Sequence, residues 1–184
     1  AGPIGLEMGQ ALALLGSQVV IVTIDETFLA HEDSAIRPYV ERWFSDLDLA
    51  IHCSAHLVRV ESQTAVVEIR DDATVVDVRQ IPFTKLLMAI GRTPNLPNGL
   101  ALAGIEATSH GVTVNATHQT TNPRVFATGD VAHQLKFTHT ADDTSRQIIT
   151  RIASRGLLRG TMKAVPKVTY TEPEIAQVGL DWES

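Results

Sequence analysis

The chain has 184 residues, of which 44% are hydrophobic and 20% are charged, a composition typical of a globular protein. Its formal net charge of −6 gives no support for binding to nucleic acid or to an anionic membrane. No apolar run approaches the ~20 residues that span a bilayer, and the first residues lack the basic segment of a signal peptide. The single cysteine, Cys53, excludes an internal disulfide. We therefore expect a cytoplasmic protein without a nucleic-acid or membrane partner.

The first segment predicts a helix followed by a buried strand. Residues 4–15 have a helical pattern, and Gly16 is placed to end that helix. Small residues recur on it at every fourth position: Gly5, Gly9 and Ala13. They make a smooth face that can lie close against a sheet. Residues 19–24 (VVIVTI) are a continuous apolar run rich in β-branched residues, which indicates a strand of a parallel sheet.

The next segment predicts a second helix and three antiparallel strands. The helix is expected over residues 34–47, with Pro38 delaying its start or kinking it. Its apolar residues fall on one face: Ile36, Val40, Trp43, Phe44 and Leu47. Three short runs of alternating polarity follow, separated by turn residues, over residues 56–62, 64–72 and 74–81. Their pattern predicts an antiparallel meander.

The second half predicts further strands, a loop and one long helix. Buried strand patterns are expected over residues 85–91, 111–115 and 124–130. Between the first two of these, residues 92–99 (RTPNLPNG) predict a loop and a crossing between domains. Residues 139–160 have the pattern of an amphipathic helix with basic residues toward its end, where they suit the helix dipole. Another strand is expected to begin after Pro166.

The opening residues AGPIG contain two glycines, Gly2 and Gly5, at the start of the predicted helix. In a G-x-G-x-x-G loop the second glycine lets the backbone approach a pyrophosphate, and the third allows close packing of helix and strand. The helix N-terminus offers unpaired N–H groups to the anion. Gly2 and Gly5 fit the second and third positions, whereas the first glycine and its strand would precede Ala1. The alternative interpretation is that these glycines serve packing alone.

A dinucleotide-binding loop is expected to have an acidic residue about 20 residues further on, at the end of the next strand, where it holds the adenosine ribose. Thr23 stands at this strand end, and Asp25 and Glu26 lie just beyond it. No Arg or Lys occurs between there and Arg37. A 2′-phosphate would therefore meet carboxylates without cationic donors, which favours NAD over NADP.

A second motif lies in TTNPRVFATGDVA, residues 120–132, where a predicted strand ends at Asp130. An aspartate there can accept a hydrogen bond from a polyol hydroxyl. With GPIGLEMG, AIGRTPN and TYTEPEIAQVG, the motif VFATGD makes the chain resemble the flavin-dependent pyridine nucleotide–disulfide oxidoreductases. This family includes dihydrolipoyl dehydrogenase, glutathione reductase and mercuric reductase. The four strings occur in the family's order and cover nearly the whole chain, and FTHTADDTSR is closer to the mercuric-reductase-like members.

The resemblance implies an α/β fold: a Rossmann-like NAD-binding domain with an antiparallel meander, followed by the C-terminal half of an FAD-binding domain. We expect the NAD(P)-binding domain over residues 1–90 without its first strand. The second half of the FAD domain is expected over 91–163, and the start of a dimerisation domain over 164–184. The implied activity is hydride transfer between NAD(P)H and FAD, with electrons passing to or from a disulfide in a homodimer.

The same resemblance assigns individual residues to the NAD site. The loop that would cradle the pyrophosphate contains Gly2, Pro3, Ile4, Gly5, Glu7 and Gly9. Glu7 would lie beside the nicotinamide, near flavin N5. Thr23 stands where NAD-using members usually have Glu. The backbone of Leu57 would meet the adenine, and Gly91 would line the nicotinamide side.

For FAD, the resemblance places Asp130 at the ribityl–phosphate region. The segment that would approach the flavin consists of Lys136, Phe137, Thr138 and His139. The helix that follows would present its N-terminus to the N1/O2 edge of the ring, where a positive helix end favours charge on the reduced flavin. Arg92 has two interpretations: it supports the nearby nucleotide, or it caps a loop. No metal site is expected, because the histidines lack ligand spacing.

Family members also have an N-terminal FAD region with a Cys-x4-Cys pair and a C-terminal domain with a His/Glu acid–base pair. We expect both to lie outside this chain, which would then be a middle section and inactive alone. The physiological electron acceptor stays open. The competing hypothesis is a catalytically silent nucleotide-binding fragment or module. A related flavoprotein without a disulfide, such as a ferredoxin or quinone reductase, is disfavoured by TEPEIAQVG at residues 171–179.

Overall fold

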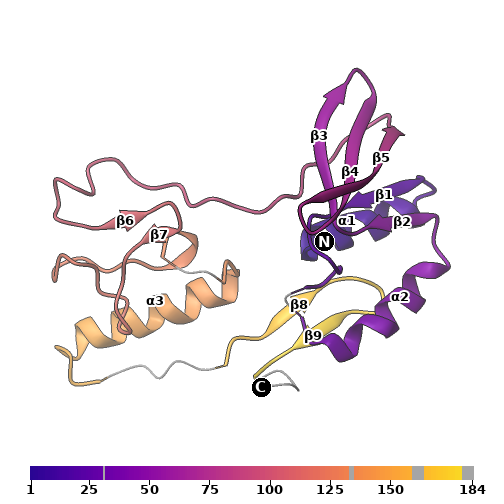
Figure 1. Cartoon of the computed structure of the whole chain (residues 1–184). Helices are drawn as coiled ribbons and strands as arrows, with labels where there is room; N and C mark the ends of the chain where they lie inside the picture. Colours follow the sequence, from indigo (N-terminus) through magenta and orange to yellow (C-terminus); the bar gives the residue numbers. More distant parts are fainter. Residues whose placement is uncertain (31, 133–134, 159–163, 180–184) are drawn as a thin grey trace. The chain divides into compact units, whose positions relative to one another are not determined.

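The computed structural model of the chain describes residues 1–30, 32–132, 135–158 and 164–179. The chain divides into two compact units. Unit 1 comprises Ala1–Gly91 together with Pro166–Ser184, and unit 2 comprises Arg92–Val165. Figure 1 traces both units along the sequence. The fold is mixed α/β, as predicted, and each unit is described by itself below.

Unit 1 begins with helix α1 (Pro3–Leu14), which confirms the first predicted helix within one residue at each end. Pro3 suits the first helical position because its ring fixes φ and its missing N–H would have no helical acceptor. Gly16 ends the helix at φ +90°, and its N–H donates to the Ala13 carbonyl at 2.9 Å. Gly9 is buried where a Cβ would lie 2.7 Å from Ile21 Cδ1, so α1 packs on the sheet through its small residues.

Strands β1 (Val19–Val22) and β2 (Leu49–His52) form a parallel pair in which Val19 lies opposite Leu49. The parallel arrangement confirms the prediction for residues 19–24, although the strand stops two residues earlier. A 3-10 turn (Ser34–Ile36) and helix α2 (Arg37–Ser45) connect the strands. The helix starts beside Pro38, as predicted. The buried core of this part comprises Ala1, Leu6, Phe28, Leu29, Val40, Phe44 and Ile175.

A three-stranded antiparallel sheet follows, with the order β3 (Ala55–Glu61), β4 (Thr64–Asp71) and β5 (Thr74–Pro82). It confirms the predicted meander and stands out in Figure 1 as three adjacent strands. Its inward side is buried at Ala55, Ala65 and Val67. Every residue of β5 except Ile81 is exposed. Since successive side chains of a strand point to opposite faces, this edge strand meets solvent on both of its faces.

The prediction of a buried strand at residues 85–91 is wrong. These residues have no strand conformation, and the side chains of Leu87 and Ile90 are 55% and 85% exposed. A strand requires a neighbour that satisfies its backbone N–H and C=O groups. Among the described residues none pairs with this segment. The apolar pattern therefore signals a strand for which the described part of the chain supplies no partner.

The last described residues return to unit 1 as an antiparallel pair, β8 (Lys167–Thr169) and β9 (Ile175–Gln177). This confirms the strand expected after Pro166. Ile175 joins the core cluster that contains Leu6 and Phe28. The loop between the strands contacts α1 through hydrogen bonds that are described with the site.

Unit 2 contains the short strands β6 (Ala107–Thr108) and β7 (Gly111–Val112), a 3-10 turn (Gly129–Val131) and helix α3 (Thr138–Ala153). Gly111 is fixed by its environment, since a Cβ there would lie 2.5 Å from the Val131 carbonyl oxygen.

The strands predicted over residues 111–115 and 124–130 are largely wrong. Only β7 and two isolated bridges form, Val114 with Thr120 and Gln119 with Phe126. Asn115 Oδ1 instead accepts hydrogen bonds from the N–H groups of Thr117 and Gln119, at 2.9 and 3.1 Å. Short polar side chains that bond to nearby backbone in this way form turns in place of ladder pairing.

Helix α3 is also shorter than the predicted 139–160. It ends at Ala153, and the chain leaves helical geometry at Arg155 (φ +53°) and Gly156 (φ +84°). The Gly156 N–H donates to the Arg151 carbonyl at 2.8 Å, which closes the helix in the manner of a left-handed cap. The last two positions of the predicted helix lie outside the described residues, as do residues 159–163 and 180–184 of the predicted domains.

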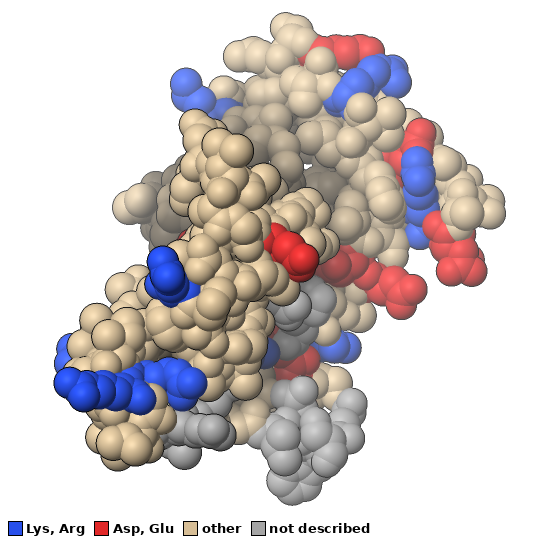
Figure 2. All heavy atoms as spheres, turned by 90° about the vertical axis from the view of Figure 1, so that its left-hand side faces the viewer, with Lys and Arg blue, Asp and Glu red and all other residues tan. Residues whose placement is uncertain are grey.

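The described helices include none that is both long enough and apolar enough to cross a membrane. Figure 2 shows charged side chains in small groups on the face drawn, separated by large areas of uncharged atoms. Large apolar side chains are exposed in both units, among them Leu15 and Ile90 in unit 1 and Leu102 and Leu157 in unit 2.

Candidate functional site

The N-terminus of α1 has the features of an anion-binding site. Gly2 precedes the helix in an extended conformation, no side chain caps the first turn, and that turn contains no acidic residue. The first helical hydrogen bond runs from the Leu6 N–H to the Gly2 carbonyl at 3.2 Å. The earlier N–H groups, those of Ile4 and Gly5, therefore have no acceptor within the helix. A Cβ on Gly2 would meet nothing within 4 Å, so space is open beside these donors.

The end of β1 brings together the residues predicted to contact the adenosine ribose. Thr23 is buried, and its Oγ1 donates to Asp25 Oδ2 at 2.9 Å. The nitrogen of Ala1 donates to the same hydroxyl at 2.8 Å and to Asp25 Oδ2 at 3.3 Å. Thr23 and Asp25 therefore form a closed polar group beneath the start of α1. The side chain of Asp25 is 36% exposed, and Glu26 is the more exposed carboxylate of the strand end.

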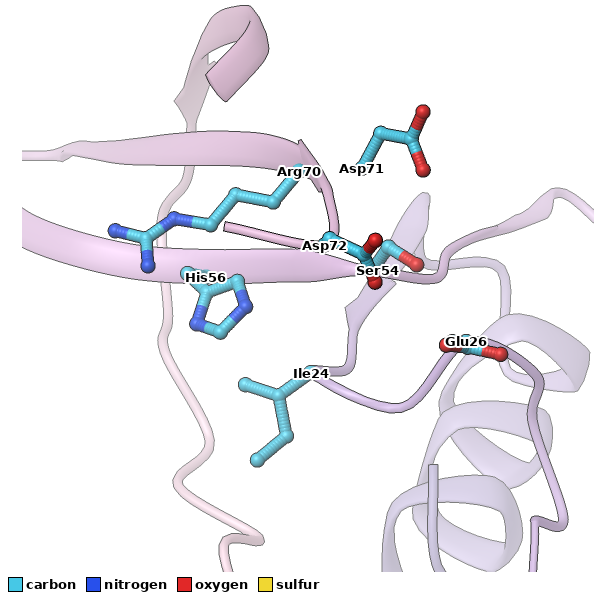
Figure 3. Close-up of a pocket in the computed structure, with 7 residues that line it drawn as sticks. All are labelled: Ile24, Glu26, Ser54, His56, Arg70, Asp71 and Asp72. Atoms are coloured by element: carbon cyan, nitrogen blue, oxygen red, sulfur yellow. The ribbon is translucent and has the colours of Figure 1, made fainter. Parts of the chain in front are cut away.

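A hollow of about 420 Å³ lies beside this strand end. Figure 3 shows Ile24 and Glu26 on one side of it, opposite the side chains of β3, β4 and their connecting turns. Its lining residues are Ile24, Glu26, Ser54, His56, Arg70, Asp71 and Asp72. The cation among them, Arg70, is bonded to Glu68 at 2.7 Å. The lining therefore offers several carboxylate acceptors and one neutralised cation, which suits sugar hydroxyls better than a phosphate.

Leu57 and Gly91 lie in different local settings. Leu57 is on β3 next to a register shift, which falls between Leu57 and Arg59. Such a bulge leaves one residue out of the ladder and frees backbone groups for other contacts.

Gly91 is exposed at φ +104°, a backbone conformation that would be strained in a residue with a side chain, and a Cβ there would meet nothing within 4 Å. Gly9 faces the sheet, so the structure gives it a packing role.

Glu7 and Gln10 lie one turn apart on α1 and both bond to the loop between β8 and β9. Glu7 Oε1 accepts the Tyr170 N–H at 2.8 Å. Gln10 Nε2 donates to the Glu172 carbonyl at 2.8 Å, and Gln10 Oε1 accepts the Glu172 N–H at 2.7 Å. Sequence reasoning assigned no role to Gln10. The signal available was a polar residue three positions after Glu7 on an otherwise apolar helix.

Unit 2 contains a second cluster, built on Arg92. Its guanidinium donates from Nη1 to Asp130 Oδ2 at 3.2 Å and from Nη2 to the Lys136 carbonyl. Lys136 Nζ in turn donates to the Arg92 carbonyl. The structure thus brings together three candidate cofactor-binding residues from separate motifs. These contacts fit both interpretations of Arg92, support of the nearby nucleotide and capping of a loop.

The approach to α3 completes this cluster. Phe137 precedes the helix, Thr138 is its first residue, and the rings of Phe137 and His139 stack with centroids 5.2 Å apart. No side chain caps the N-terminus of α3. Thr128, just before Gly129, bonds to the hydroxyls of Thr144 and Ser145 on α3. These bonds hold the ATGD turn against the helix.

Sequence reasoning missed Arg70, His56 and Asp72 as lining residues of the hollow. They lie 30 or more positions beyond Thr23 in the chain, and only the folding of the meander brings them to the end of β1. The alternating polarity along the strands does not predict which polar residues face this hollow. Groups of acidic, histidine and cysteine residues that could hold a metal ion do not occur within the described ranges.

Comparison with known proteins identifies the class. Residues 1–145 match the model of the pyridine nucleotide-disulphide oxidoreductase family. The chain is 32% identical to dihydrolipoyl dehydrogenase of Bacillus subtilis (strain 168) over 97% of its length, and 33% identical to mercuric reductase of Lysinibacillus sphaericus over 100%. It spans 38% and 34% of those two proteins. Among solved structures it resembles the HOCl-induced flavoprotein disulfide reductase RclA from Escherichia coli. That match has a TM-score of 0.83 at 27% identity and covers 99% of this chain and 41% of that one.

The chain belongs to the pyridine nucleotide-disulphide oxidoreductase family. The resemblance expressed by its glycine, GRTPN, ATGD and TEPE motifs is confirmed. Its mixed α/β fold with antiparallel sheets is that of flavoprotein disulfide reductases.

Proposed function

We propose that this chain is the part of a flavoprotein oxidoreductase that positions a nicotinamide dinucleotide and part of FAD. The intact homodimeric protein would transfer hydride between NAD(P)H and FAD and exchange electrons with a disulfide. The observation that carries the proposal is the N-terminus of α1, which no side chain caps and which has open space beside Gly2. It is found in a chain that belongs to this family. When bound, FAD supplies the hydride and electron chemistry, while the protein supplies binding, orientation and electrostatics.

In unit 1, the proposed pyrophosphate ligands are the N–H groups at the start of α1. An anion bound there is stabilised by the unpaired N–H donors and by the positive end of the helix dipole. The ribose hydroxyls of the adenosine would be held by Glu26 and by the polar side chains of the hollow, and Leu57 would approach the adenine through its backbone. Gly91 and Glu7 would line the nicotinamide end.

NAD is proposed over NADP because of the charges around the hollow. Glu26, Asp71 and Asp72 line it, and its single arginine is already paired with Glu68. A 2′-phosphate would be placed near like charges, which is unfavourable in a partly enclosed site. The two hydroxyls of an unphosphorylated ribose would instead donate to carboxylates, and such charge-assisted hydrogen bonds are strong.

In unit 2, the proposed flavin contacts are Asp130, the segment from Lys136 to His139 and the uncapped start of α3. These residues fit the chemistry of FAD. A carboxylate can accept hydrogen bonds from the ribityl hydroxyls, and a helix N-terminus can face an electron-rich edge of the flavin ring. Arg92 would hold Asp130 and Lys136 in place.

The test uses the purified chain. We expect saturable binding of NADH, followed by nicotinamide fluorescence, and weaker binding of NADPH. An absorption spectrum shows whether flavin is retained. We expect little, since part of the FAD site is proposed to lie elsewhere. Binding of NADH supports the proposal, whereas a chain that binds neither dinucleotide nor flavin supports the hypothesis of a silent fragment.

A further inference from the structure

The contact between α1 and the loop from Tyr170 to Glu172 joins residues more than 160 positions apart within unit 1. Gln10 is 5% exposed, and both ends of its amide are used on one residue, Glu172. A flip of this amide would break both hydrogen bonds, so the Glu172 N–H and carbonyl fix its orientation. A buried amide that loses such partners destabilises the fold, because its desolvation is no longer compensated by hydrogen bonds. Gln10 therefore anchors the loop firmly to the helix.

This anchor determines where the Tyr170 N–H points. Glu172 lies two residues after Tyr170, and Thr171 between them is buried, with its hydroxyl donating to the Pro173 carbonyl at 2.8 Å. The short segment has little freedom once Glu172 is bonded to Gln10. Its Tyr170 N–H is held 2.8 Å from Glu7 Oε1. A glutamate side chain has several rotatable bonds, so this N–H selects one orientation of the carboxylate.

We propose that Gln10 is a positioning residue for the nicotinamide end of the dinucleotide site, acting through the Glu172 backbone and the Tyr170 N–H to orient Glu7. The inference rests on the proposed function, which places Glu7 beside the nicotinamide. The oxidised nicotinamide ring carries a positive charge that the reduced ring lacks. A carboxylate fixed nearby stabilises the oxidised form selectively, and one that is free to turn into solvent does so less.

The inference has a signature that general weakening of the fold does not share. Loss of the Gln10 anchor should lower affinity for NAD⁺ more than affinity for NADH, because only the oxidised ring interacts strongly with the carboxylate. A purely structural role would weaken the binding of both forms by the same factor. The ratio of the two dissociation constants therefore separates positioning from stability.

The experiment measures the dissociation constants of NAD⁺ and NADH for the full chain by calorimetry. We expect Gln10→Met to raise the NAD⁺/NADH ratio of dissociation constants about fivefold, because a reoriented Glu7 loses part of its attraction to the charged ring. Gln10→Asn, one methylene too short for both bonds, should act in the same direction and guards against misfolding of the first variant. Gln147→Met is the matched control: Gln147 bonds to Asp143 at 2.7 Å on α3, and the ratio should stay unchanged.

The decisive comparison is with Glu7→Gln, which should raise the ratio by itself. Since Gln10 acts through Glu7, the double variant should show the ratio of Glu7→Gln alone. Equal weakening of both ligands in the Gln10 variants, or an additive effect in the double variant, overturns this inference and leaves the proposed function intact. A wild-type chain that binds neither ligand contradicts the proposed function and the inference together.

Discussion

The hydroxyl of Thr23 donates a 2.9 Å hydrogen bond to the carboxylate of Asp25 at the end of β1. The same carboxylate receives the nitrogen of Ala1 at 3.3 Å. Asp25 thus bonds to the buried hydroxyl of its own strand end. Its neighbour Glu26 is left to line the hollow. The two acidic residues that the sequence presents as equivalent candidates for the ribose have different environments.

This difference predicts which substitution changes dinucleotide preference. Glu26→Arg should raise affinity for NADPH relative to NADH by about tenfold, because it replaces a repulsive carboxylate with a donor for the 2′-phosphate. Asp25→Arg should shift the preference in the same direction but weaken binding of both dinucleotides, since it removes the acceptor of Thr23. Fluorescence titration of both variants checks this. An unchanged NADPH/NADH ratio in both would show that the strand end does not face the ribose.

Gly9 is predicted to be required for packing of α1 on the sheet. Gly9→Val should lower the free energy of unfolding by about 2 kcal/mol, because its side chain would overlap Ile21 and overpacked cores cost about 1–3 kcal/mol. The matched control is Ala11→Val on the exposed side of the same helix, which should cost only the propensity difference of about 0.5 kcal/mol. Urea denaturation measures both, and equal losses would contradict close packing at Gly9.

The pair of His52 and Arg79 predicts a pH dependence of stability. Burial, and secondarily the positive charge of Arg79, lower the pKa of His52 below its ordinary value of 6.5; Arg79 Nη1 lies 3.3 Å from His52 Nδ1. As the pH falls below 6.5, the unfolded chain takes up a proton that the folded chain resists. Stability is therefore lost as the pH falls from 6.5 through the lower folded pKa.

The measurement compares the free energy of unfolding at pH 7.5 and pH 5.5 in wild type and His52→Gln. The wild type should lose more stability over this interval, because the variant lacks the titrating ring. The lowered pKa of Asp77, caused by its hydrogen bond to Arg79, affects only the range below about pH 4. Identical pH profiles for the two proteins would show that His52 titrates as in the unfolded chain.

Arg92 is predicted to stabilise unit 2 more than an ordinary surface arginine does. Arg92→Leu should cost about 1 kcal/mol, since it removes contacts to both Asp130 and the Lys136 carbonyl. Arg146 is the control, because its exposed pair with Asp142 lies within one helix and solvent screening leaves such pairs with little effect on stability. Thermal denaturation measures the stability of Arg92→Leu and Arg146→Leu. A larger loss of stability in the Arg146 variant would contradict a stabilising role of the Arg92 cluster.

The sequence predicted the local elements whose causes are local. Pro3 and Gly16 mark the ends of α1, and alternation locates β3 to β5, because both signals depend on neighbouring residues. It failed at residues 85–91, where an apolar run needs a partner strand, and at residues 111–115, where the side chain of Asn115 bonds to nearby backbone in place of ladder pairing. The hollow combines the end of β1 with residues of the meander, and Gln10 meets Glu172 across most of the chain. Such pairings depend on tertiary contacts that no local pattern encodes.

The most direct test of the central claim is a comparison of NADH binding by wild type and Gly2→Glu. The start of α1 is proposed to receive a pyrophosphate, so a carboxylate placed there should lower NADH affinity more than tenfold. Ala11→Glu, which adds the same charge on the exposed side of α1, should leave affinity within about twofold. Saturable binding that is unaffected by Gly2→Glu would contradict the claim, as would the absence of binding to the wild-type chain.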